Sequence, residues 1–235
     1  MTTLPFRLSD DWSAGDSGRA SVWYPLVGLV IGALTWLAWK ATMLFFPPLV
    51  AGVLTLVIWV ALTGGLHLDG LADCCDGLLA SASVERRLEI MKDPHMGAFG
   101  VIGLILVLFL KAATLASLAS LTPASSFSIL LAASLARWCI LPAGLLPLAR
   151  PSGSGMGADF ASGFRHSFIF WGAIIPLVIA ITLGARGVLS MFAGLGAAGL
   201  VLWLAKSRIG GVTGDVFGMV VEIVEVVVLL TFAIH

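Results

Sequence analysis

Residues 49–77 read LVAGVLTLVIWVALTGGL followed by HLDGLADCCDG. The first part is an apolar run of about the length that a helix needs to cross a bilayer. The second part carries three carboxylates, spaced four and then three residues apart, which puts them on one face of an α-helix. The stretch therefore predicts a membrane-spanning helix that leads directly into a helix with an acidic stripe (Asp69, Asp73 and Asp76).

The acidic stripe has no interleaved Lys or Arg. Like charges this close raise one another's pKa unless a cation lies among them. Carboxylate oxygens are the ligands that Mg²⁺ prefers, and Mg²⁺ usually binds together with phosphate groups. We therefore expect Mg²⁺ as cofactor and phosphate chemistry beside the lipid. For His67 two interpretations stay open, a group that shapes the site and a hydrogen-bonded structural histidine.

The composition excludes a soluble domain, because 59% of the residues are hydrophobic, 11% are charged and the mean hydropathy is +1.06. We expect an all-α polytopic membrane bundle of about seven transmembrane helices, forming a single integral-membrane catalytic domain over residues 1–235. Residues 1–21 have no early apolar region and are interpreted as a cytoplasmic N-terminal segment rather than a signal peptide. The apolar segments are Val22–Phe46, Leu49–Leu66, Ala98–Leu121, Phe127–Leu148, Phe168–Leu183, Val188–Leu204 and Val216–Ile234.

Basic residues fall on alternate connections of this seven-segment arrangement. By the positive-inside rule, the N-terminus and every polar connection then face the cytoplasm, and the C-terminus lies outside. A site built from these connections would meet nucleotides and Mg²⁺. Only Arg186, with Lys40 near the end of the first segment, lies on the opposite side. The residues on the cytoplasmic side are Arg7, Arg19, Arg86, Arg87, Lys92, Arg150, Arg165, Lys206 and Arg208.

The connection after the acidic stripe predicts a short cytoplasmic amphipathic helix over Ser83–Asp93, with Ser83 as its N-cap. Arg86 and Arg87 have two open interpretations, interfacial anchors and phosphate ligands. The stretch Lys92–Gly100 places two charges and several glycines at the mouth of the next span, where a diphosphate could bind free backbone N–H groups. Lys92 and Asp93 are therefore candidate catalytic residues, with capping as the alternative.

The last span carries carboxylates that are costly inside a membrane and usually mark a site. Asp215 and Glu222 are seven residues apart and share a helical face. We predict that this face packs against the acidic stripe, so that both carboxylates join the metal site, whereas Glu225 pairs with Lys111 or Arg137. Arg137 is also a candidate for holding a substrate phosphate. Small residues that allow close backbone approach, and are candidates for substrate binding, are Gly64, Gly65, Gly211 and Gly214.

Together these segments resemble the cobalamin synthase family, the adenosylcobinamide-GDP ribazoletransferases of bacterial membranes. The matching stretches occur in the family's order and span nearly the whole chain. Cys74-Cys75 and Pro94-His95-Met96 are unusual for the family, but neither removes a carboxylate. The stretches are Tyr24–Gly28, Thr63–Asp73 with Asp76-Gly77, Lys92-Asp93 with Gly97–Gly100, and Gly210–Asp215 with Gly218 and Glu222.

The resemblance implies Mg²⁺-dependent transfer of the cobinamide phosphate from adenosylcobinamide-GDP to a hydroxyl of α-ribazole or its 5′-phosphate, releasing GMP. It implies a multi-pass protein of the bacterial inner membrane with a cytoplasmic active face, no nucleic-acid partner, and either self-association or association with other cobalamin-assembly enzymes. On this interpretation the catalytic residues are Asp69, Asp73, Asp76, His67, Lys92 and Asp93, and the metal ligands are Asp69, Asp73, Asp76, Asp215 and Glu222.

Two alternatives stay open. Asp73–Gly77 echoes the Asp-x-x-Asp-Gly start of the CDP-alcohol phosphotransferase motif, but the later Gly-x-x-x-Asp-x-x-x-Asp does not follow. An ion or metabolite transporter could use the intramembrane charges Glu222, Glu225, Lys111 and Arg137 as its path. Against a transporter stands the gathering of the polar connections on one side, because transporters place their sites near the midplane.

Overall fold

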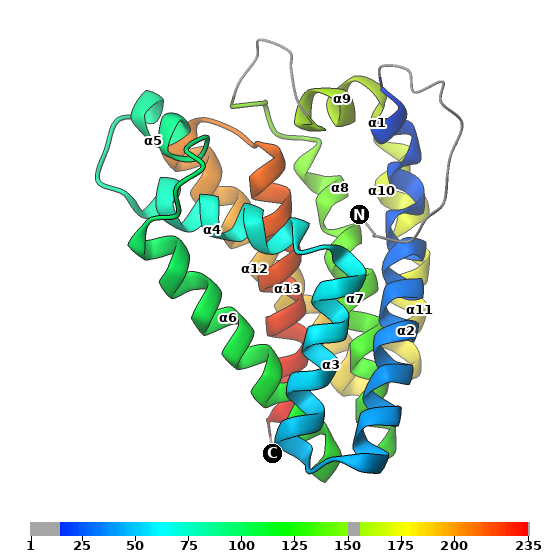
Figure 1. Cartoon of the computed structure of the whole chain (residues 1–235). Coiled ribbons are helices and arrows are strands. Elements are labelled where there is room, and N and C mark those ends of the chain that lie inside the picture. The colour runs from blue at the N-terminus through cyan, green and yellow to red at the C-terminus, as the bar shows by residue number, and fades with distance from the viewer. Residues whose placement is uncertain (1–14, 150–155, 235) are drawn as a thin grey trace.

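The structure is a computed structural model that describes residues 15–149 and 156–234. Its regular elements are all helices, arranged as a bundle of upright helices with shorter helices across one end (Figure 1). Arg7 and Arg150 lie outside the described residues. The helices are α1 (Asp16–Ala20), η1 (Ser21–Trp23), α2 (Tyr24–Phe45), α3 (Pro48–Thr63), α4 (Leu66–Leu79), α5 (Val84–Ile90), α6 (Ala98–Ser117), η2 (Leu118–Ser120), η3 (Pro123–Phe127), α7 (Ser128–Trp138), α8 (Ile140–Ala143), α9 (Met156–Gly163), α10 (Ser167–Gly172), α11 (Ile174–Thr182), α12 (Gly184–Ile209) and α13 (Gly214–Ala233).

The all-α membrane bundle predicted from the sequence is confirmed, but a count of seven spans is not. Five continuous helical stretches in the described residues are long and apolar enough to cross a bilayer. A sixth is formed only by counting α3 and α4 together, although they meet at an angle of 93°. The pair α10 and α11 forms a shorter apolar stretch, Ser167–Thr182. Large apolar side chains such as Leu37, Phe109 and Trp203 are exposed on the outside, as expected for lipid contact.

The polar connections gather at one end of the bundle. Helices α1, α5 and α9 lie at the top of Figure 1, α4 crosses the molecule below them, and the connection between α12 and α13 reaches the same end. The C-terminus and the turn between α2 and α3 lie at the opposite end. The grouping expected from the basic residues is therefore present in the fold.

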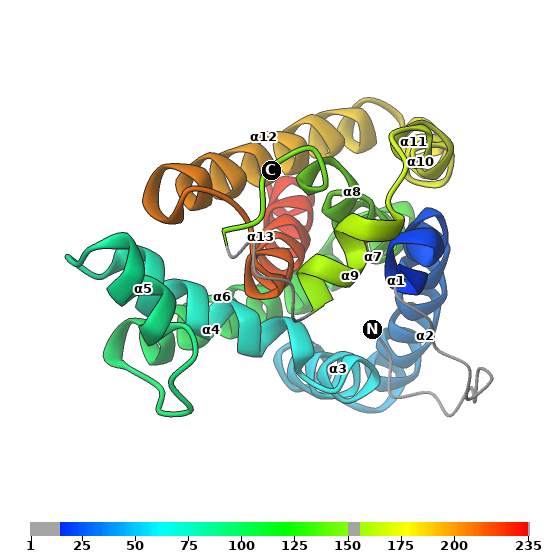
Figure 2. The same cartoon turned by 90° about the horizontal axis from the view of Figure 1, so that it is seen from above.

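Helix α13 lies in the middle of the bundle, between α12 on one side and α4 and α6 on the other (Figure 2). It packs against α4, α6, α7 and α12, and most of its side chains are buried. A helix buried on all sides is expected to be apolar all round. The carboxylates of α13 are therefore the exception that needs an explanation.

Two adjacent glycines turn the chain from α3 into α4. Gly64 and Gly65 have φ values of 64° and 70°, in the left-handed region that side chains with a Cβ rarely adopt. Gly64 ends α3 and Gly65 precedes α4, and the two helices consequently meet at 93°. Helix α4, with the acidic stripe, therefore runs across the end of the bundle and not along the membrane normal (Figure 1).

The far end of α4 is held by Arg87 of α5. Its guanidinium donates hydrogen bonds to the carbonyls of Leu78 at 2.6 Å, Ala82 at 2.9 Å and Gly77 at 3.4 Å. Carbonyls in the last turn of a helix lack partners within the helix, and a cation there also complements the helix dipole. The sequence left two interpretations open for Arg87, a phosphate ligand and an interfacial anchor. The structure shows neither of them. Ser83 is the N-cap of α5, as predicted.

Candidate functional site

The acidic stripe lies on a single helix, α4, as the spacing predicts. Asp69 is exposed, and Asp73 and Asp76 are half-buried. Asp76 accepts hydrogen bonds from the backbone N–H groups of Gly97, at 2.8 Å, and Gly100, at 2.9 Å. A carboxylate is stabilised at a helix N-terminus, so Asp76 fastens α4 to the start of α6.

Asp215 joins the stripe from a distant part of the chain. A side-chain carbon added at Gly70 would lie 2.8 Å from the Asp215 carbonyl oxygen, and one added at Gly218 would lie 2.9 Å from the His67 carbonyl oxygen. The first turns of α4 and α13 therefore touch backbone to backbone. The predicted packing of the last span against the acidic stripe is confirmed for its N-terminal end. Thr213 Oγ1 donates to the Asp215 carboxylate at 3.2 Å.

The charges of this acidic site (Asp69, Asp73 and Asp215) reinforce one another. Burial, and then the nearby carboxylates of Asp215, Asp69 and Asp76, raise the pKa of Asp73 from its usual 3.8 to about 6. In the described part of the chain, no Lys or Arg forms an ion pair with Asp69 or Asp73.

The donor set fits Mg²⁺, although the side chains do not form a closed cage. No group of three His, Cys, Asp or Glu side chains in the described ranges is gathered tightly enough to hold a metal alone. Mg²⁺ does not require one, because it is usually held by one or two carboxylates, several waters and the substrate's phosphates. The acidic site offers oxygen ligands only.

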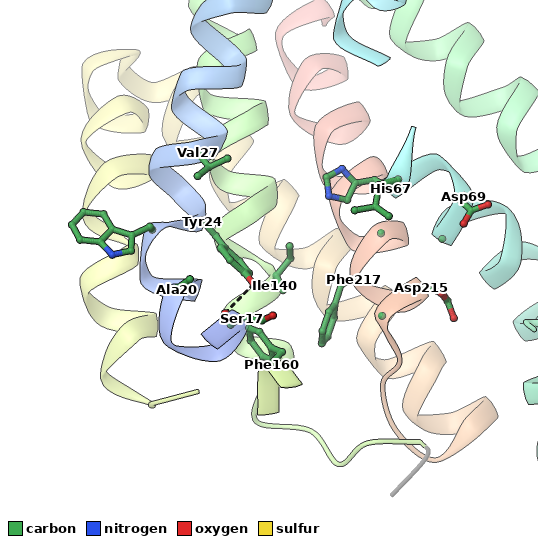
Figure 3. Close-up of a pocket in the computed structure, with 15 residues that line it drawn as sticks. Ser17, Ala20, Tyr24, Val27, His67, Asp69, Ile140, Phe160, Asp215 and Phe217 are labelled. Atoms are coloured by element: carbon green, nitrogen blue, oxygen red, sulfur yellow. Dashed lines mark hydrogen bonds between the residues drawn. The ribbon is translucent and has the colours of Figure 1, made fainter. Parts of the chain in front are cut away.

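A cavity of about 560 Å³ lies beside the acidic site, between α2, α4, α9 and α13. Figure 3 shows Tyr24, Val27, Ile140, Phe160 and Phe217 around it, with the His67 ring directed toward Val27 and Tyr24. The carboxylates of Asp69 and Asp215 lie beyond α13 and point away from Tyr24 in this view (Figure 3). The cavity therefore has an apolar, aromatic interior and an acidic rim.

His67 is the polar side chain in this interior. It is 4% exposed, and its Nδ1 atom is buried without a hydrogen-bond partner among the described residues. Burial, and then the positive charges of Arg137 and Lys111, lower the pKa of His67 well below its usual value, so the imidazole is neutral. The interpretation of His67 as a hydrogen-bonded structural histidine is therefore not what the structure shows.

A second hollow, of about 460 Å³, lies on the other side of α4, against α6. Gly64 and Gly65 line it together with Met96, Leu104 and Leu108. Asp69 borders both hollows. The two glycines predicted to bind substrate thus lie at a hollow next to the acidic site, and Asp69 stands between the two spaces.

The intramembrane charges form a separate ion-pair cluster (Lys111, Arg137, Glu222 and Glu225). Lys111 donates to Glu222 at 2.5 Å and also pairs with Glu225, which pairs in turn with Arg137. All four side chains are at most 5% exposed, and the Lys111 ammonium lies 5.1 Å from the centre of the Trp59 ring. The predicted pairing of Glu225 is confirmed, with both Lys111 and Arg137.

The structure gives Glu222 and Arg137 a different place from the one expected. Glu222 lies two helical turns below Asp215, about 10 Å along the axis, and reaches Lys111 instead of the acidic stripe. Arg137 is fully buried and bound to Glu225, and does not line the cavity. A buried charge needs an opposite charge beside it, so these two side chains neutralise the core.

The remaining predicted residues are divided between the site and its surroundings. Gly214 lines the cavity. Gly211 packs instead against the segment before α9, where an added side-chain carbon would lie 2.2 Å from the Pro147 carbonyl oxygen. Lys92 and Asp93 are exposed in the loop between α5 and α6, and Asp93 accepts a hydrogen bond from the backbone N–H of His95 at 2.9 Å. Neither lines the cavity.

Nothing in the sequence marks the cavity residues Val27, Ile140, Phe160 and Phe217 as site residues. They are apolar residues in apolar or amphipathic helices, like the many that face lipid. Tyr24 was noted only as part of a matching stretch. Tyr24 is the sole Tyr of the chain and lies next to Pro25 at the start of a span. This rare polar aromatic residue is the feature of the sequence that could have indicated the cavity wall.

The chain is similar to known proteins over nearly its whole length. A family model described as cobalamin-5-phosphate synthase matches residues 1–233. Among similar curated proteins, the adenosylcobinamide-GDP ribazoletransferase of Desulfitobacterium hafniense is 36% identical over 98% of this chain and 92% of its own. The proteins of that name from Brevibacillus brevis and Stutzerimonas stutzeri are 40% and 39% identical, over 92% and 100% of this chain and 87% and 95% of theirs. No solved structure matches the chain.

Proposed function

The chain belongs to the cobalamin synthase family of transferases, and we propose that it transfers the adenosylcobinamide phosphate group from adenosylcobinamide-GDP to α-ribazole or its 5′-phosphate. The products are the corresponding adenosylcobalamin and GMP. We place the reaction at the end of the bundle where α4, α9 and α13 meet, on the cytoplasmic face of the bacterial inner membrane. The basic residues at that end support this orientation.

The observation that carries the proposal is the meeting of carboxylates from two distant segments beside a cavity. Asp69 and Asp73 come from α4 and Asp215 comes from α13, and burial together with the neighbouring carboxylates raises the pKa of Asp73 to about 6. Holding three like charges together costs folding free energy. A transferase that must bind a diphosphate through a cation uses this arrangement directly.

In the proposed mechanism, Asp73 and Asp215 would hold Mg²⁺, which when bound would neutralise charge on the diphosphate and on the departing GMP. A hydroxyl oxygen of the acceptor forms a bond to the phosphorus of the cobinamide phosphate, and the bond from that phosphorus to the GMP oxygen breaks. Phosphoryl transfer depends mainly on positioning and charge stabilisation. The backbone contact between α4 and α13 fixes the carboxylates relative to one another.

The acceptor's hydroxyl proton must also be removed. Asp69 is exposed, borders both hollows and has no hydrogen-bond partner for its carboxylate in the described structure, so we assign it as the proton acceptor. Asp76 is held by Gly97 and Gly100 and acts by positioning α4 against α6. Lys92, exposed in the neighbouring loop, is the basic side chain that we assign to the donor's phosphates.

The test is to reconstitute the reaction. Purified protein in lipid nanodiscs is incubated with adenosylcobinamide-GDP, α-ribazole and Mg²⁺, and the cobamide and GMP are quantified by liquid chromatography. We expect equal amounts of both products, and none when Mg²⁺ is chelated. GMP release that needs no acceptor, or no product beside an active control enzyme, would contradict the proposal.

The two alternatives are less well supported. The ion-pair cluster that a transporter would need as a path is closed and formally neutral, with two positive and two negative side chains. A CDP-alcohol phosphotransferase would show CMP release from a CDP-alcohol in the same assay.

A further inference from the structure

The interior wall of the cavity is built from aromatic rings. The Phe160 and Phe217 rings meet edge to face with their centres 5.2 Å apart, and the Tyr24 ring is tilted against Phe160 with centres 6.3 Å apart. Val27 and Ile140 add aliphatic side chains to this wall. Aromatic walls of this kind favour flat apolar groups, which gain stacking in addition to burial.

The polar groups of the cavity are unevenly placed. His67 is deep in the wall, and within the described residues its Nδ1 atom lacks a hydrogen-bond partner. Tyr24 already donates its hydroxyl hydrogen to the Ser17 carbonyl at 3.1 Å. Asp69 and Asp215 line the rim of the cavity, and their carboxylates point away from Tyr24, into the acidic site (Figure 3). An occupant with one flat, nearly apolar end and one hydroxylated end would therefore be oriented with its hydroxyls toward the acidic site.

We propose that this cavity binds the acceptor nucleoside, with its benzimidazole-type base among Tyr24, Phe160 and Phe217 and its ribose toward Asp69 and Asp215. This assignment rests on the proposed function. A cavity of about 560 Å³ lies within the range of about 300–1,000 Å³ that encloses drug-sized molecules, which is the size of a nucleoside. The donor is a corrinoid nucleotide several times larger, so its corrin ring remains outside.

The guanine base of the donor is the competitor of similar size, and the cavity's chemistry disfavours it. Guanine carries a carbonyl, a ring N–H and an amino group along one edge, and each needs a partner when buried. Leaving one buried polar group unpaired costs about 1–3 kcal/mol. A benzimidazole attached to ribose has a single free ring nitrogen. Among the described residues of this wall, His67 offers a buried Nδ1 atom without a hydrogen-bond partner, which can bond to it.

The test uses two valines of α2 that differ in what they face. Val27 lines the cavity, whereas Val30, one turn later, is 45% exposed on the outer surface. Val27→Trp should fill the cavity and raise the KM for α-ribazole at least tenfold, with the KM for adenosylcobinamide-GDP unchanged. Val30→Trp should leave both constants within twofold of the wild type. A rise in the donor KM alone for Val27→Trp would overturn the assignment in favour of guanine.

A second variant removes stacking without filling space. Phe217→Ala should weaken equilibrium binding of α-ribazole by about tenfold, the size of losing one aromatic ring beside a base. Binding is measured by calorimetry in nanodiscs without donor or Mg²⁺, and guanosine serves as the comparison ligand. Guanosine binding that is tighter than α-ribazole binding and sensitive to Phe217→Ala would also overturn the assignment. Because this measurement needs no turnover, it tests the occupant of the cavity even if the transfer reaction itself is not observed.

Discussion

The chain holds two groups of acidic side chains, and they differ in their neighbours. In the acidic site at the end of the bundle the carboxylates lie beside one another, and burial together with these like charges raises the pKa of Asp73. In the ion-pair cluster, Glu222 and Glu225 each touch a basic side chain and all four members are buried. Carboxylates are rare in this apolar chain, yet they occur in both groups. Their rarity alone therefore does not identify a functional site. What distinguishes the acidic site is that like charges lie beside one another in it.

The largest effect is expected in the acidic site, where like charges lie together. Asp73→Asn should reduce transfer by roughly 100- to 1,000-fold, the size seen when one preorganised charge-stabilising group is lost. Because the repulsion is relieved, the folded protein should be at least as stable as the wild type. Both are measured on purified protein, by product formation and by thermal unfolding.

The matched control for this substitution is Glu89→Gln, which removes an exposed carboxylate of α5 at the same end of the bundle. It should leave transfer within about twofold, as expected for a surface change. Transfer by Asp73→Asn within tenfold of the control would mean that the acidic site is not the reaction centre.

The opposite pattern is expected in the ion-pair cluster. Glu225→Gln leaves Arg137 and Lys111 with one carboxylate between them, and breaking a buried ion pair by removing one partner costs about 3–5 kcal/mol. The thermal midpoint in detergent should fall, whereas the molecules that remain folded should keep their Mg²⁺ requirement.

Charge balance can be restored to check this cause. The double variant Arg137→Met with Glu225→Gln leaves Lys111 and Glu222 as a balanced pair. It should be more stable than Glu225→Gln alone. A double variant that is less stable than the single one would show that shape, not charge, holds the cluster together.

A smaller effect is expected at the far end of α4. Arg87→Met leaves the last carbonyls of α4 without a donor, at a cost of about 1–3 kcal/mol. Its neighbour Arg86 is 67% exposed and pairs with Glu89 on the surface, so Arg86→Met should change stability by less than about 0.5 kcal/mol. Thermal unfolding of the two variants side by side decides whether α4 depends on this cap; equal midpoints would show that it does not.

The sequence predicts the membrane bundle, the acidic stripe and the packing of the last span on it, because apolar runs and helical spacing are local signals. The sequence does not show that Asp215 and Glu222 have different neighbours, because both lie on one face of the helix. Their positions along the helix axis decide that Asp215 lies near the acidic stripe and Glu222 near Lys111. The angle at Gly64 and Gly65 is also invisible to spacing, because glycines permit many directions and the packing of α4 on α13 selects one.

The residues that line the cavity show most clearly what the sequence does not predict. Val27 and Val30 are the same residue type on the same helix, yet one lines the cavity and the other is exposed on the outside. No pattern of hydropathy distinguishes the two, because lipid and a binding cavity both favour apolar side chains. Such residues become visible only when α9 and α13 are placed beside α2.

The most direct test of the two-segment site is the Mg²⁺ requirement of transfer in Asp215→Asn and Glu222→Gln, two carboxylates of the same helix. If α4 and α13 hold the cation together, Asp215→Asn should raise the Mg²⁺ concentration for half-maximal rate about 10- to 100-fold, as is typical when a group that supports metal binding is lost. Glu222→Gln should leave it unchanged in the protein that folds. An unchanged requirement in Asp215→Asn would show that α4 binds the metal alone, and a raised requirement in Glu222→Gln would bring the ion-pair cluster back into the site.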